Sequence, residues 1–391
     1  MGITDRGNKH DHEILYAKII SSLQEWCAQE IDTIDAKTID PDKPFYCFNS
    51  HWSKRFKLRN DLLPWVLENT TLTTFYPDEL QANSTPRSVA GYLADRLTSE
   101  RERPARPPIL PRKTGKIEDP TVFVLGCARS GTTIFRCMLM GHSLIYAGPE
   151  LHMMQFESLL QRERALVEAG TPWMVMGFSQ TIQDLTGWSE QEAFHYISTL
   201  TKRDLPIEDV YRIIHGYSEK PILVDKSPTI MQVPSTLERI ESRFSTPRYI
   251  YITRHPYAVI ESMVRLDALP FKKLTDTRTA EKVWLDSNTT IREFLGRIPK
   301  VRWHHLSYED LMRTTEESLR GVTDFLGVAY EPLMSEPYNG DRLLHSVGCV
   351  NLPKRQRVEP ELAEKWKTIN LERPLLPKTI SLANSLGYEC R

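Results

Sequence analysis

A glycine-containing segment that follows a short apolar run carries the clearest chemical signal of the sequence. The stretch TVFVLGCARSGTTIFRCML predicts a strand, a loop from Gly126 to Thr133, and then a helix. Gly126 and Gly131 allow the backbone to wrap, so that several N–H groups converge at the helix N-terminus, where negative charge is favoured. The hydroxyls of Ser130, Thr132 and Thr133 add further donors. The segment therefore predicts a site for a phosphate-sized anion.

The residue after the second glycine separates this loop from that of nucleotide kinases. Kinase-type loops follow the pattern GxxxxGK[ST], in which the lysine reaches the β- and γ-phosphates. Thr132 stands at the lysine position here, which argues against ATP or GTP hydrolysis. Arg129 instead places a fixed positive charge inside the loop. A P-loop kinase-like phosphotransferase stays open as an alternative, as does a glycine-rich turn that only joins a strand to a helix.

A second strand-to-helix junction repeats this geometry further along the chain. The run RYIYIT (248–253) predicts a strand, and a helix is expected to follow the break at Pro256. Arg254 and Ser262 are eight residues apart, which places them on either side of one phosphate if the helix begins between them. The alternatives are a surface salt bridge for Arg254 and a solvent-facing hydroxyl for Ser262.

The two motifs in this order resemble the sulfotransferases that use 3′-phosphoadenosine 5′-phosphosulfate (PAPS), over about residue 119 to the C-terminus. In that family the RSGTT loop holds the 5′-phosphosulfate and an arginine–serine pair holds the 3′-phosphate. The resemblance implies a site built from Arg129, Ser130, Gly131, Thr132, Thr133, Arg254 and Ser262. It also implies that PAP is the product.

Further residues are assigned to the donor site on the same resemblance. Asp225-Lys226-Ser227-Pro228 follows a predicted strand, as DKSP does in several bacterial sulfotransferases. Sulfuryl transfer requires charge stabilisation on the leaving phosphate, and if Lys226 and Arg129 supply it no metal is required. Apart from the resemblance, Lys354, Arg355 and Arg357 form a basic cluster that could close over the 3′-phosphate, with a solvated loop as the favoured alternative for each of them.

The acceptor must lose a proton, so a general base is expected near the loop. The segment AGPELH (147–152) follows the first helix and returns towards the loop. A glutamate after a similar helix is the base in tyrosylprotein sulfotransferases, which implies Glu150 here, although a carboxylate at a helix N-terminus is the alternative. His152 is the second candidate for the base and His345 the third.

The elements that position these residues follow from the periodicity of the chain. Four short β-rich runs alternate with helical stretches, at 121–125, 221–224, 248–253 and 301–306. This alternation predicts an α/β fold of P-loop type, with a parallel sheet flanked by helices. Trp284 lies in an apolar helical stripe and is expected in the core. Acceptor specificity is expected in variable loops at 161–209 and 272–278.

The N-terminal part differs in character. The sequence pattern predicts a small helical domain over residues 1–100. It also predicts a linker rich in proline and basic residues over 101–118, followed by the sulfotransferase-like domain over 119–391. The first domain resembles an acyl carrier domain in which Trp52 stands where the phosphopantetheine serine is expected, which implies a degenerate carrier. An unrelated helical cap is the alternative. A carrier domain followed by a sulfotransferase resembles modules of cyanobacterial polyketide and olefin-forming pathways.

The composition of the chain restricts the classes of partner and the compartment that we expect for it. The net charge of −1 argues against a general nucleic-acid binder, and six scattered cysteines suit a reducing compartment. The absence of a signal peptide and of an apolar run long enough for a membrane span predicts a cytoplasmic protein. The expected acceptor is a small molecule, either a polyketide or a toxin-like natural product, sulfated on a hydroxyl or a nitrogen. Docking of the enzyme to a synthase is one expected interaction. A catalytically inactive docking module is the alternative to an enzyme.

Overall fold

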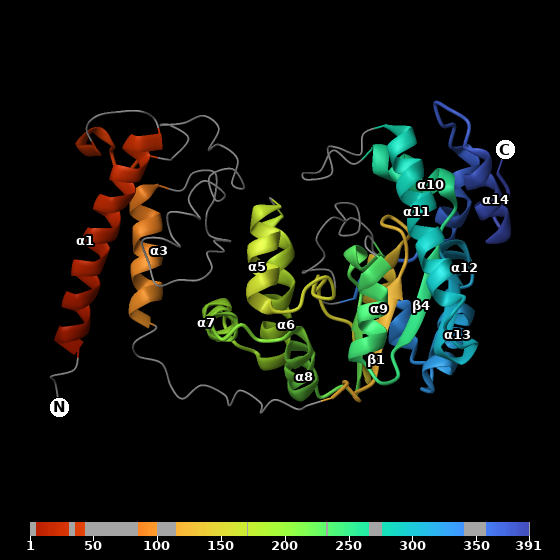
Figure 1. The fold of residues 1–391 in the computed structure, drawn as a ribbon, viewed down its shortest axis with the longest axis horizontal. Helices are drawn as coiled ribbons and strands as arrows, with labels where there is room; N and C mark the ends of the chain where they lie inside the picture. Colours follow the sequence, from red (N-terminus) through yellow and green to blue (C-terminus); the bar gives the residue numbers. More distant parts are fainter. Residues whose placement is uncertain are drawn as a thin grey trace. The chain divides into compact units, whose positions relative to one another are not determined.

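The structure is a computed structural model that describes residues 5–30, 36–43, 85–99, 115–169, 171–231, 234–265, 276–339 and 357–390 (Figure 1). These residues divide into two compact units. One unit comprises 1–109 with 189–204, and the other comprises 110–188 with 205–391. The second unit contains both phosphate-type motifs.

The first unit is helical in the residues described. Its elements are α1 (Asp5–Glu30), η1 (Ala36–Thr38), α3 (Pro86–Ser99) and α7 (Glu190–Lys202). Helices α1 and α3 pack against each other, with Leu23, Trp26 and Leu93 buried. The helical character predicted for the N-terminal part is therefore confirmed in the described residues. Trp52 and most of the predicted linker lie outside the described residues, so the carrier-like domain and the domain boundaries stay predictions.

The second unit is built on a five-stranded parallel sheet in the order β2-β3-β1-β4-β5. The strands are β1 (Thr121–Leu125), β2 (Ile145–Tyr146), β3 (Ile222–Asp225), β4 (Arg248–Thr253) and β5 (Trp303–Ser307). Four of them match the predicted strands to within two residues, and the α/β expectation is confirmed. The predicted set lacked β2, because two residues are too few to show an alternating pattern. Central β1 lies between β3 and β4, so its loop is flanked by both neighbouring strand ends.

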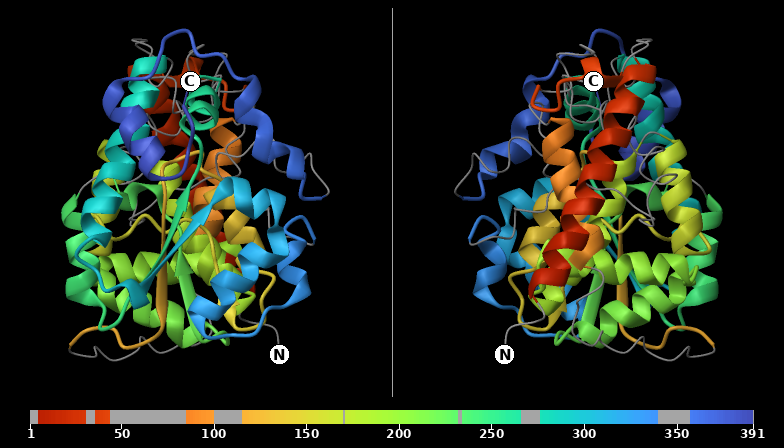
Figure 2. Two further views of the ribbon diagram at one scale, coloured as in Figure 1. Left: turned by 90° about the vertical axis from the view of Figure 1, so that its right-hand side faces the viewer. Right: turned by 90° about the vertical axis from the view of Figure 1, so that its left-hand side faces the viewer.

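Helices cover both faces of the sheet, because successive strand residues point to opposite sides. On one face, Val122, Val124 and Ile250 pack with residues of α4 (Thr132–Leu139), α12 (Tyr308–Arg313) and α13 (Thr315–Leu326). In Figure 2 the α12 and α13 helices, in light blue, lie on one side of the strands and α11, in cyan, on the other. The chain carries the buried apolar face that a doubly covered parallel sheet requires.

The opposite face is aromatic. Phe123 of β1 meets Phe244 edge to face at 5.1 Å, and Tyr249 of β4 meets Phe294 at 5.1 Å. Tyr211 also meets Phe244 edge to face, at 5.2 Å. These rings bring in α8 (Ile207–Tyr217), α9 (Pro234–Arg243) and α11 (Thr277–Leu295). Edge-to-face pairs of this kind add about 0.5–1.5 kcal/mol each to the burial energy of the rings.

Further helices lie between the strands in sequence or follow the last one. They are α5 (Leu159–Glu168), α6 (Met176–Thr186), α10 (Pro256–Val264) and α14 (Pro377–Ser385), with short 3₁₀ turns η4 (Pro172–Val175), η5 (Pro228–Met231), η6 (Lys300–Arg302), η7 (Pro332–Ser335) and η10 (Pro360–Thr368). Trp284 is completely buried, as its apolar stripe predicted.

The segment 161–209, predicted as a variable loop, is largely helical. Helix α5 has Ser158 as its N-cap, and α7 begins with a capping box between Ser189 and Glu192. Such caps satisfy the first free N–H groups of a helix and stabilise its start. The loop prediction was therefore wrong here. Of the second predicted loop, 272–278, only 276–278 are described.

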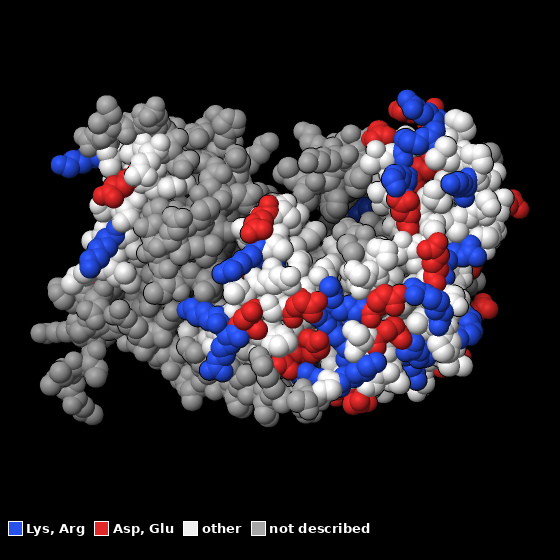
Figure 3. All heavy atoms as spheres, in the orientation of Figure 1, with Lys and Arg blue, Asp and Glu red and all other residues white. Residues whose placement is uncertain are grey.

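The face of the second unit seen in Figure 3 is mixed in charge. Figure 3 shows Lys and Arg side chains interspersed with Asp and Glu over the visible face of the second unit. This pattern agrees with the net charge of −1 and gives no broad field of one sign. Within the described residues, no helix has both the length and the apolar character that crossing a bilayer requires.

Candidate functional site

The loop between β1 and α4 is held close to two other elements. Gly131 has a φ of 86°, and Arg129 also has a positive φ, of 72°, which is uncommon for a residue with a side chain. A Cβ added to Gly131 would overlap the ring of Tyr308 at the start of α12. A Cβ on Gly126 would lie 2.6 Å from the side chain of Ile252 on β4. Both glycines are thus required for the close approach of the loop backbone.

The second motif meets the loop directly. Arg254 donates from a terminal guanidinium nitrogen to the backbone oxygen of Arg129 at 2.9 Å, and its guanidinium lies 4.1 Å from the ring centre of Tyr308. Arg129 in turn donates from Nε to the hydroxyl of Ser262 at 3.0 Å. Arg129, Arg254 and Ser262, which the sequence assigned to two separate motifs, are therefore brought together. Tyr308, which lies between Gly131 and Arg254, was not expected in the site.

Two buried donors at this junction have no hydrogen-bond partner among the described residues. They are Nε of Arg254 and the hydroxyl of Ser130. Buried polar groups in native proteins are nearly always satisfied, so such groups beside an anion-type loop fit a bound ligand with acceptor oxygens. Phosphate oxygens are suitable acceptors for both groups.

The backbone around Arg254 is fixed from both sides. Trp284 donates from its indole N–H to the backbone oxygen of Arg254 at 3.1 Å. The next residue, His255, donates its backbone N–H to the buried carboxylate of Glu309 at 3.0 Å. Its ring stacks on Trp366 with the centroids 4.0 Å apart, and burial lowers the pKa of His255 to about 4. His255 is therefore neutral near pH 7 and contributes packing contacts rather than a positive charge.

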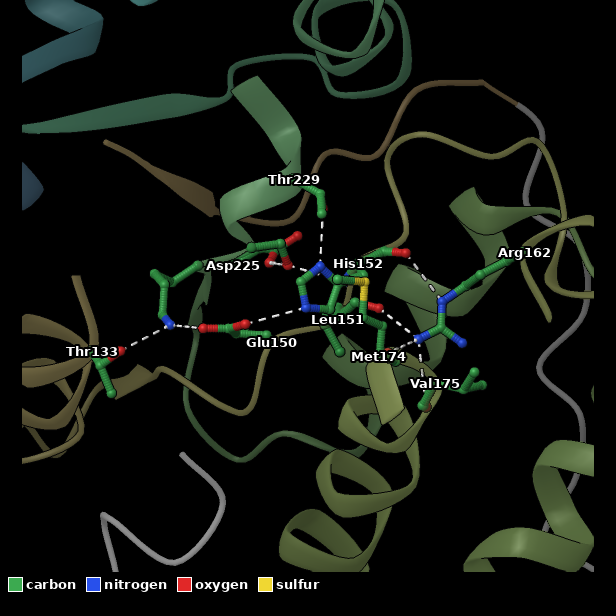
Figure 4. Close-up of polar contacts among 11 residues, drawn as sticks. Thr133, Glu150, Leu151, His152, Arg162, Met174, Val175, Asp225 and Thr229 are labelled. Atoms are coloured by element: carbon green, nitrogen blue, oxygen red, sulfur yellow. Dashed lines mark hydrogen bonds and ion pairs between the residues drawn. The ribbon is translucent and has the colours of Figure 1, made fainter. Parts of the chain in front are cut away.

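A second group of polar residues adjoins the loop (Figure 4). Lys226, directly after β3, forms an ion pair with Glu150 and also donates to the hydroxyl of Thr133 at 3.4 Å. The other carboxylate oxygen of Glu150 lies 3.1 Å from Nε2 of His152. Nδ1 of His152 lies 2.9 Å from the hydroxyl of Thr229. Glu150, His152 and Lys226, each singled out on sequence, thus form one connected cluster.

The charge state of Glu150 is set by its neighbours. Burial acts to raise its pKa, but the positive charge of Lys226 and the hydrogen bond to His152 outweigh this effect. The pKa of Glu150 is consequently lowered to about 2. At neutral pH the carboxylate is therefore ionised.

A chain of buried hydrogen bonds adjoins the cluster of Glu150, His152 and Lys226. Tyr211 donates to the carboxylate of Asp225, and the hydroxyl of Ser227 donates to the same carboxylate at 2.6 Å. Ser227 also accepts from the backbone N–H of His152 at 3.0 Å. Burial raises the pKa of Asp225. Residues of the DKSP segment therefore fix the backbone of the Glu150–His152 segment, a role that sequence spacing alone did not reveal.

Two candidates from the sequence are not placed. His345, the third candidate for the base, and Arg355, expected over the 3′-phosphate, both lie outside the described residues. Their assignments stay predictions.

Known proteins match this part of the chain. A family model described as "Sulfotransferase family" matches residues 120–332. The protein-tyrosine sulfotransferase of Drosophila melanogaster is 24% identical over 264 residues, which cover 65% of the chain and 46% of the fly protein. Protein-tyrosine sulfotransferase 2 of Gallus gallus is 23% identical over 256 residues, which cover 65% of the chain and 62% of the chicken protein. The chain thus spans about half to three fifths of the length of these relatives.

Two solved structures match more closely. A sulfotransferase domain from the curacin biosynthetic pathway is 34% identical with a TM-score of 0.63, and the match covers 71% of the chain and 100% of that domain. A sulfotransferase domain from the Synechococcus PCC 7002 olefin synthase is also 34% identical, with a TM-score of 0.66, over 71% of the chain and 98% of that domain.

Proposed function

The chain belongs to the sulfotransferase family, and on that premise we propose that it transfers a sulfuryl group from PAPS to a hydroxyl or a nitrogen of a small-molecule acceptor. The observation that carries this proposal is the position of the Lys226–Glu150 ion pair. Lys226 contacts both the carboxylate and Thr133 of the anion-type loop. A cation and a base therefore adjoin the place where a transferable group would be held.

The donor site is assigned to the two motifs. Backbone N–H groups of the loop from Gly126 to Thr133 are suited to the 5′-phosphosulfate, because they lie at the N-terminus of α4. Arg254 and Ser262 are suited to the 3′-phosphate. The unpartnered Nε of Arg254 and hydroxyl of Ser130 support this assignment, since both would gain an acceptor oxygen. The geometry also offers the charges of Arg129 and Lys226, so a metal ion is not part of the proposal.

The reaction is proposed as an in-line displacement in which positioning and electrostatics dominate. PAPS supplies the sulfuryl group, whose bond to the phosphate oxygen breaks as the bond to the acceptor oxygen or nitrogen forms. Glu150 takes the acceptor proton on a carboxylate oxygen. Lys226 and Arg129 stabilise the negative charge that develops on the leaving phosphate. His152 orients Glu150 through its Nε2 contact and stays the second candidate for the base.

The names of the similar solved domains support the proposed acceptor class. One is named for the curacin biosynthetic pathway and the other for an olefin synthase. Their names support an acyl-chain or polyketide-type alcohol as the acceptor, with the chain acting alone or docked to a synthase. A 3-hydroxyacyl pantetheine thioester is therefore the first compound to test.

The first experiment is calorimetric titration with PAP in the presence of EDTA, with ATP as the comparison ligand. Micromolar or tighter binding of PAP with little binding of ATP is the expected result. Binding of ATP with Mg²⁺ but not of PAP would favour the kinase-like alternative. Binding of neither nucleotide would favour the inactive docking module.

Turnover is tested next, by following the conversion of PAPS to PAP. The acceptors are a 3-hydroxyacyl pantetheine thioester, a simple secondary alcohol and a primary amine. Conversion that depends on one of these compounds identifies the nucleophile class. Tight PAP binding without turnover on any of them would leave the donor assignment intact and contradict the acceptor class.

A further inference from the structure

A buried arginine holds the segment that carries Glu150. Arg162 lies on α5 and is completely buried. It donates from Nε to the backbone oxygen of His152 at 3.1 Å, and from one terminal nitrogen to the backbone oxygens of Leu151 at 2.7 Å and Met174 at 2.8 Å. Figure 4 shows these contacts on the side of His152 away from Thr133.

The segment needs such a partner because it has no regular structure of its own. Residues 150–153 belong neither to a helix nor to a strand, so their buried backbone oxygens must find donors elsewhere. His152 also has a φ of 49°, a left-handed conformation that costs about 1–2 kcal/mol for a residue with a side chain. A planar guanidinium can hold two successive backbone oxygens at fixed angles, which a lysine ammonium cannot do as rigidly.

The same segment is fixed on its other sides. The backbone N–H of His152 is bound to Ser227, and its ring contacts Thr229. Gly177 of α6 lies so close to Glu150 that an added Cβ would overlap the backbone oxygen of Glu150. Because Arg162 also binds Met174, which lies just before α6, it links the start of that helix to the segment with the carboxylate.

We propose that Arg162 is a positioning residue for the base: it sets the place of the Glu150 carboxylate relative to Lys226 and the anion-type loop by holding the backbone oxygens of Leu151 and His152. The inference rests on the proposed role of Glu150. Arg162 does not touch the reacting atoms in this scheme, and its effect on the rate passes through the segment that it holds.

The chain offers a matched control in Arg243. That side chain is also buried and also binds backbone, donating to the oxygen of Phe156 at 2.9 Å. Its ion pairs are with Glu157 and Glu208, so it holds neighbouring chain but not the Glu150 segment. The Arg162→Lys and Arg243→Lys variants therefore remove comparable buried guanidinium groups at different places.

The test compares these variants for PAP affinity, turnover and deuterium uptake of the peptide spanning 147–154 in the PAP-bound protein. Arg162→Lys is expected to lower kcat about ten- to a hundred-fold, the range for a misplacement near 1 Å, with PAP affinity within about two-fold of wild type. Deuterium uptake of that peptide should rise. Arg243→Lys should leave kcat and the uptake of that peptide unchanged. An equal fall in kcat for both variants would overturn the proposal.

A double-mutant cycle separates this inference from the proposed function. If Arg162 acts through Glu150, Arg162→Lys should lower the residual rate of Glu150→Gln by less than about two-fold. A full effect of Arg162→Lys in the Glu150→Gln background would overturn the positioning role. If Glu150→Gln itself keeps the wild-type rate, the base assignment fails, whatever Arg162 does.

A second variant keeps the test decisive should Arg162→Lys fail to fold. Gly177→Ala introduces a methyl group where the backbone oxygen of Glu150 lies, and so displaces the same segment from the side of α6. Gly321→Ala is its control, because that glycine also lies inside a helix, α13, and an added Cβ would make only an ordinary contact, 3.6 Å from the ring of His304. A fall in kcat for Gly177→Ala alone, with PAP affinity kept, is expected. Unchanged kcat would show that the rate does not depend on the place of the segment.

Discussion

The Nε of Arg129 donates to the hydroxyl of Ser262 at 3.0 Å, although the two residues lie 133 positions apart in the chain. One comes from the loop after β1 and the other from α10, after the neighbouring strand β4. The carboxyl ends of adjacent parallel strands meet at one edge of the sheet, which is why two remote motifs share a single hydrogen bond. The two phosphate-type sites proposed here are therefore connected through one guanidinium.

Removal of that guanidinium should lower turnover strongly. Arg129→Ala is expected to lower kcat by about a hundred-fold or more, because a fixed charge beside the leaving phosphate is lost. PAP affinity should fall less, since Arg254 and the loop backbone remain. Steady-state rates and calorimetry measure the two effects. Arg265→Ala, which removes an exposed arginine paired with Glu261 on α10, should change neither quantity. A wild-type rate for Arg129→Ala would remove the loop arginine from the mechanism.

Substitution of Arg254 should act mainly on nucleotide affinity. Arg254→Lys keeps the positive charge but loses the planar contact with Tyr308 and the unpartnered Nε. The dissociation constant for PAP is expected to rise about ten- to a hundred-fold, or about 1.4–2.7 kcal/mol. Calorimetry with PAP measures the change. Arg248→Lys, at the other end of β4, is the control and should bind PAP as wild type does. Unchanged affinity of Arg254→Lys would relocate the 3′-phosphate site.

The sequence predicted those parts of the site that depend on local pattern. The strand-loop-helix units that carry Arg129 and Arg254 are continuous in the chain, so their residue types and spacing are sufficient to identify them. Tyr308 escaped prediction because its contact with Gly131 joins positions far apart, and no local period records such a contact. Arg162 escaped for a related reason: an arginine in an amphipathic helix is expected at the surface unless a buried partner is known.

The local sequence pattern also failed to predict secondary-structure elements that are very short or that begin at a capping residue. Strand β2 has two residues, below the length at which alternation can be recognised. The helices within 161–209 are short and start at capped positions such as Ser158 and Ser189, yet the segment was predicted as a loop. Glu150 and Lys226 were each identified as candidates, yet their ion pair depends on how β3 adjoins the segment after α4, which is tertiary information.

Gly131 offers a test of the contact between the loop and α12. A left-handed φ costs an alanine about 1–2 kcal/mol. Gly131→Ala is expected to lower the free energy of unfolding by more than this amount, because the new methyl group also overlaps the ring of Tyr308. Gly327→Ala is the matched control, with a φ of 76° and no atom within 4 Å of an added Cβ. Urea denaturation measures both free energies of unfolding.

The two glycine variants should also differ in ligand binding. Gly131→Ala moves the backbone N–H groups at the start of α4 and should weaken PAP binding, whereas Gly327→Ala should leave it intact. Equal stabilities and equal PAP affinities for the two variants would contradict the role of the Gly131–Tyr308 contact in shaping the loop.

The Glu150→Gln variant tests the base and the ion pair in one protein. Turnover is expected to fall by about a hundred-fold or more, the usual range for loss of a general base, while PAP affinity stays within about two-fold of wild type. Glu157→Gln, which alters an exposed carboxylate paired with Arg243, is the control for turnover. A wild-type rate for Glu150→Gln would pass the role of base to His152 or His345.

The free energy of unfolding of the same variant should differ from that of wild type in a pH-dependent way. The sign of this dependence follows from the pKa of Glu150. Burial opposes ionisation, but Lys226 and His152 hold the pKa at about 2, below the ordinary value of 4.5. A lowered pKa contributes stability that is fully present above about pH 4.5 and is lost as the pH falls towards 2. Glu150→Gln lacks this contribution and leaves the buried Lys226 without its carboxylate, so at neutral pH its free energy of unfolding should be lower by about 3–5 kcal/mol. The difference from wild type, measured by urea denaturation, should be constant down to about pH 5 and then shrink as the pH is lowered further. A difference that grows on acidification would show that the Glu150 carboxylate is not held ionised by Lys226.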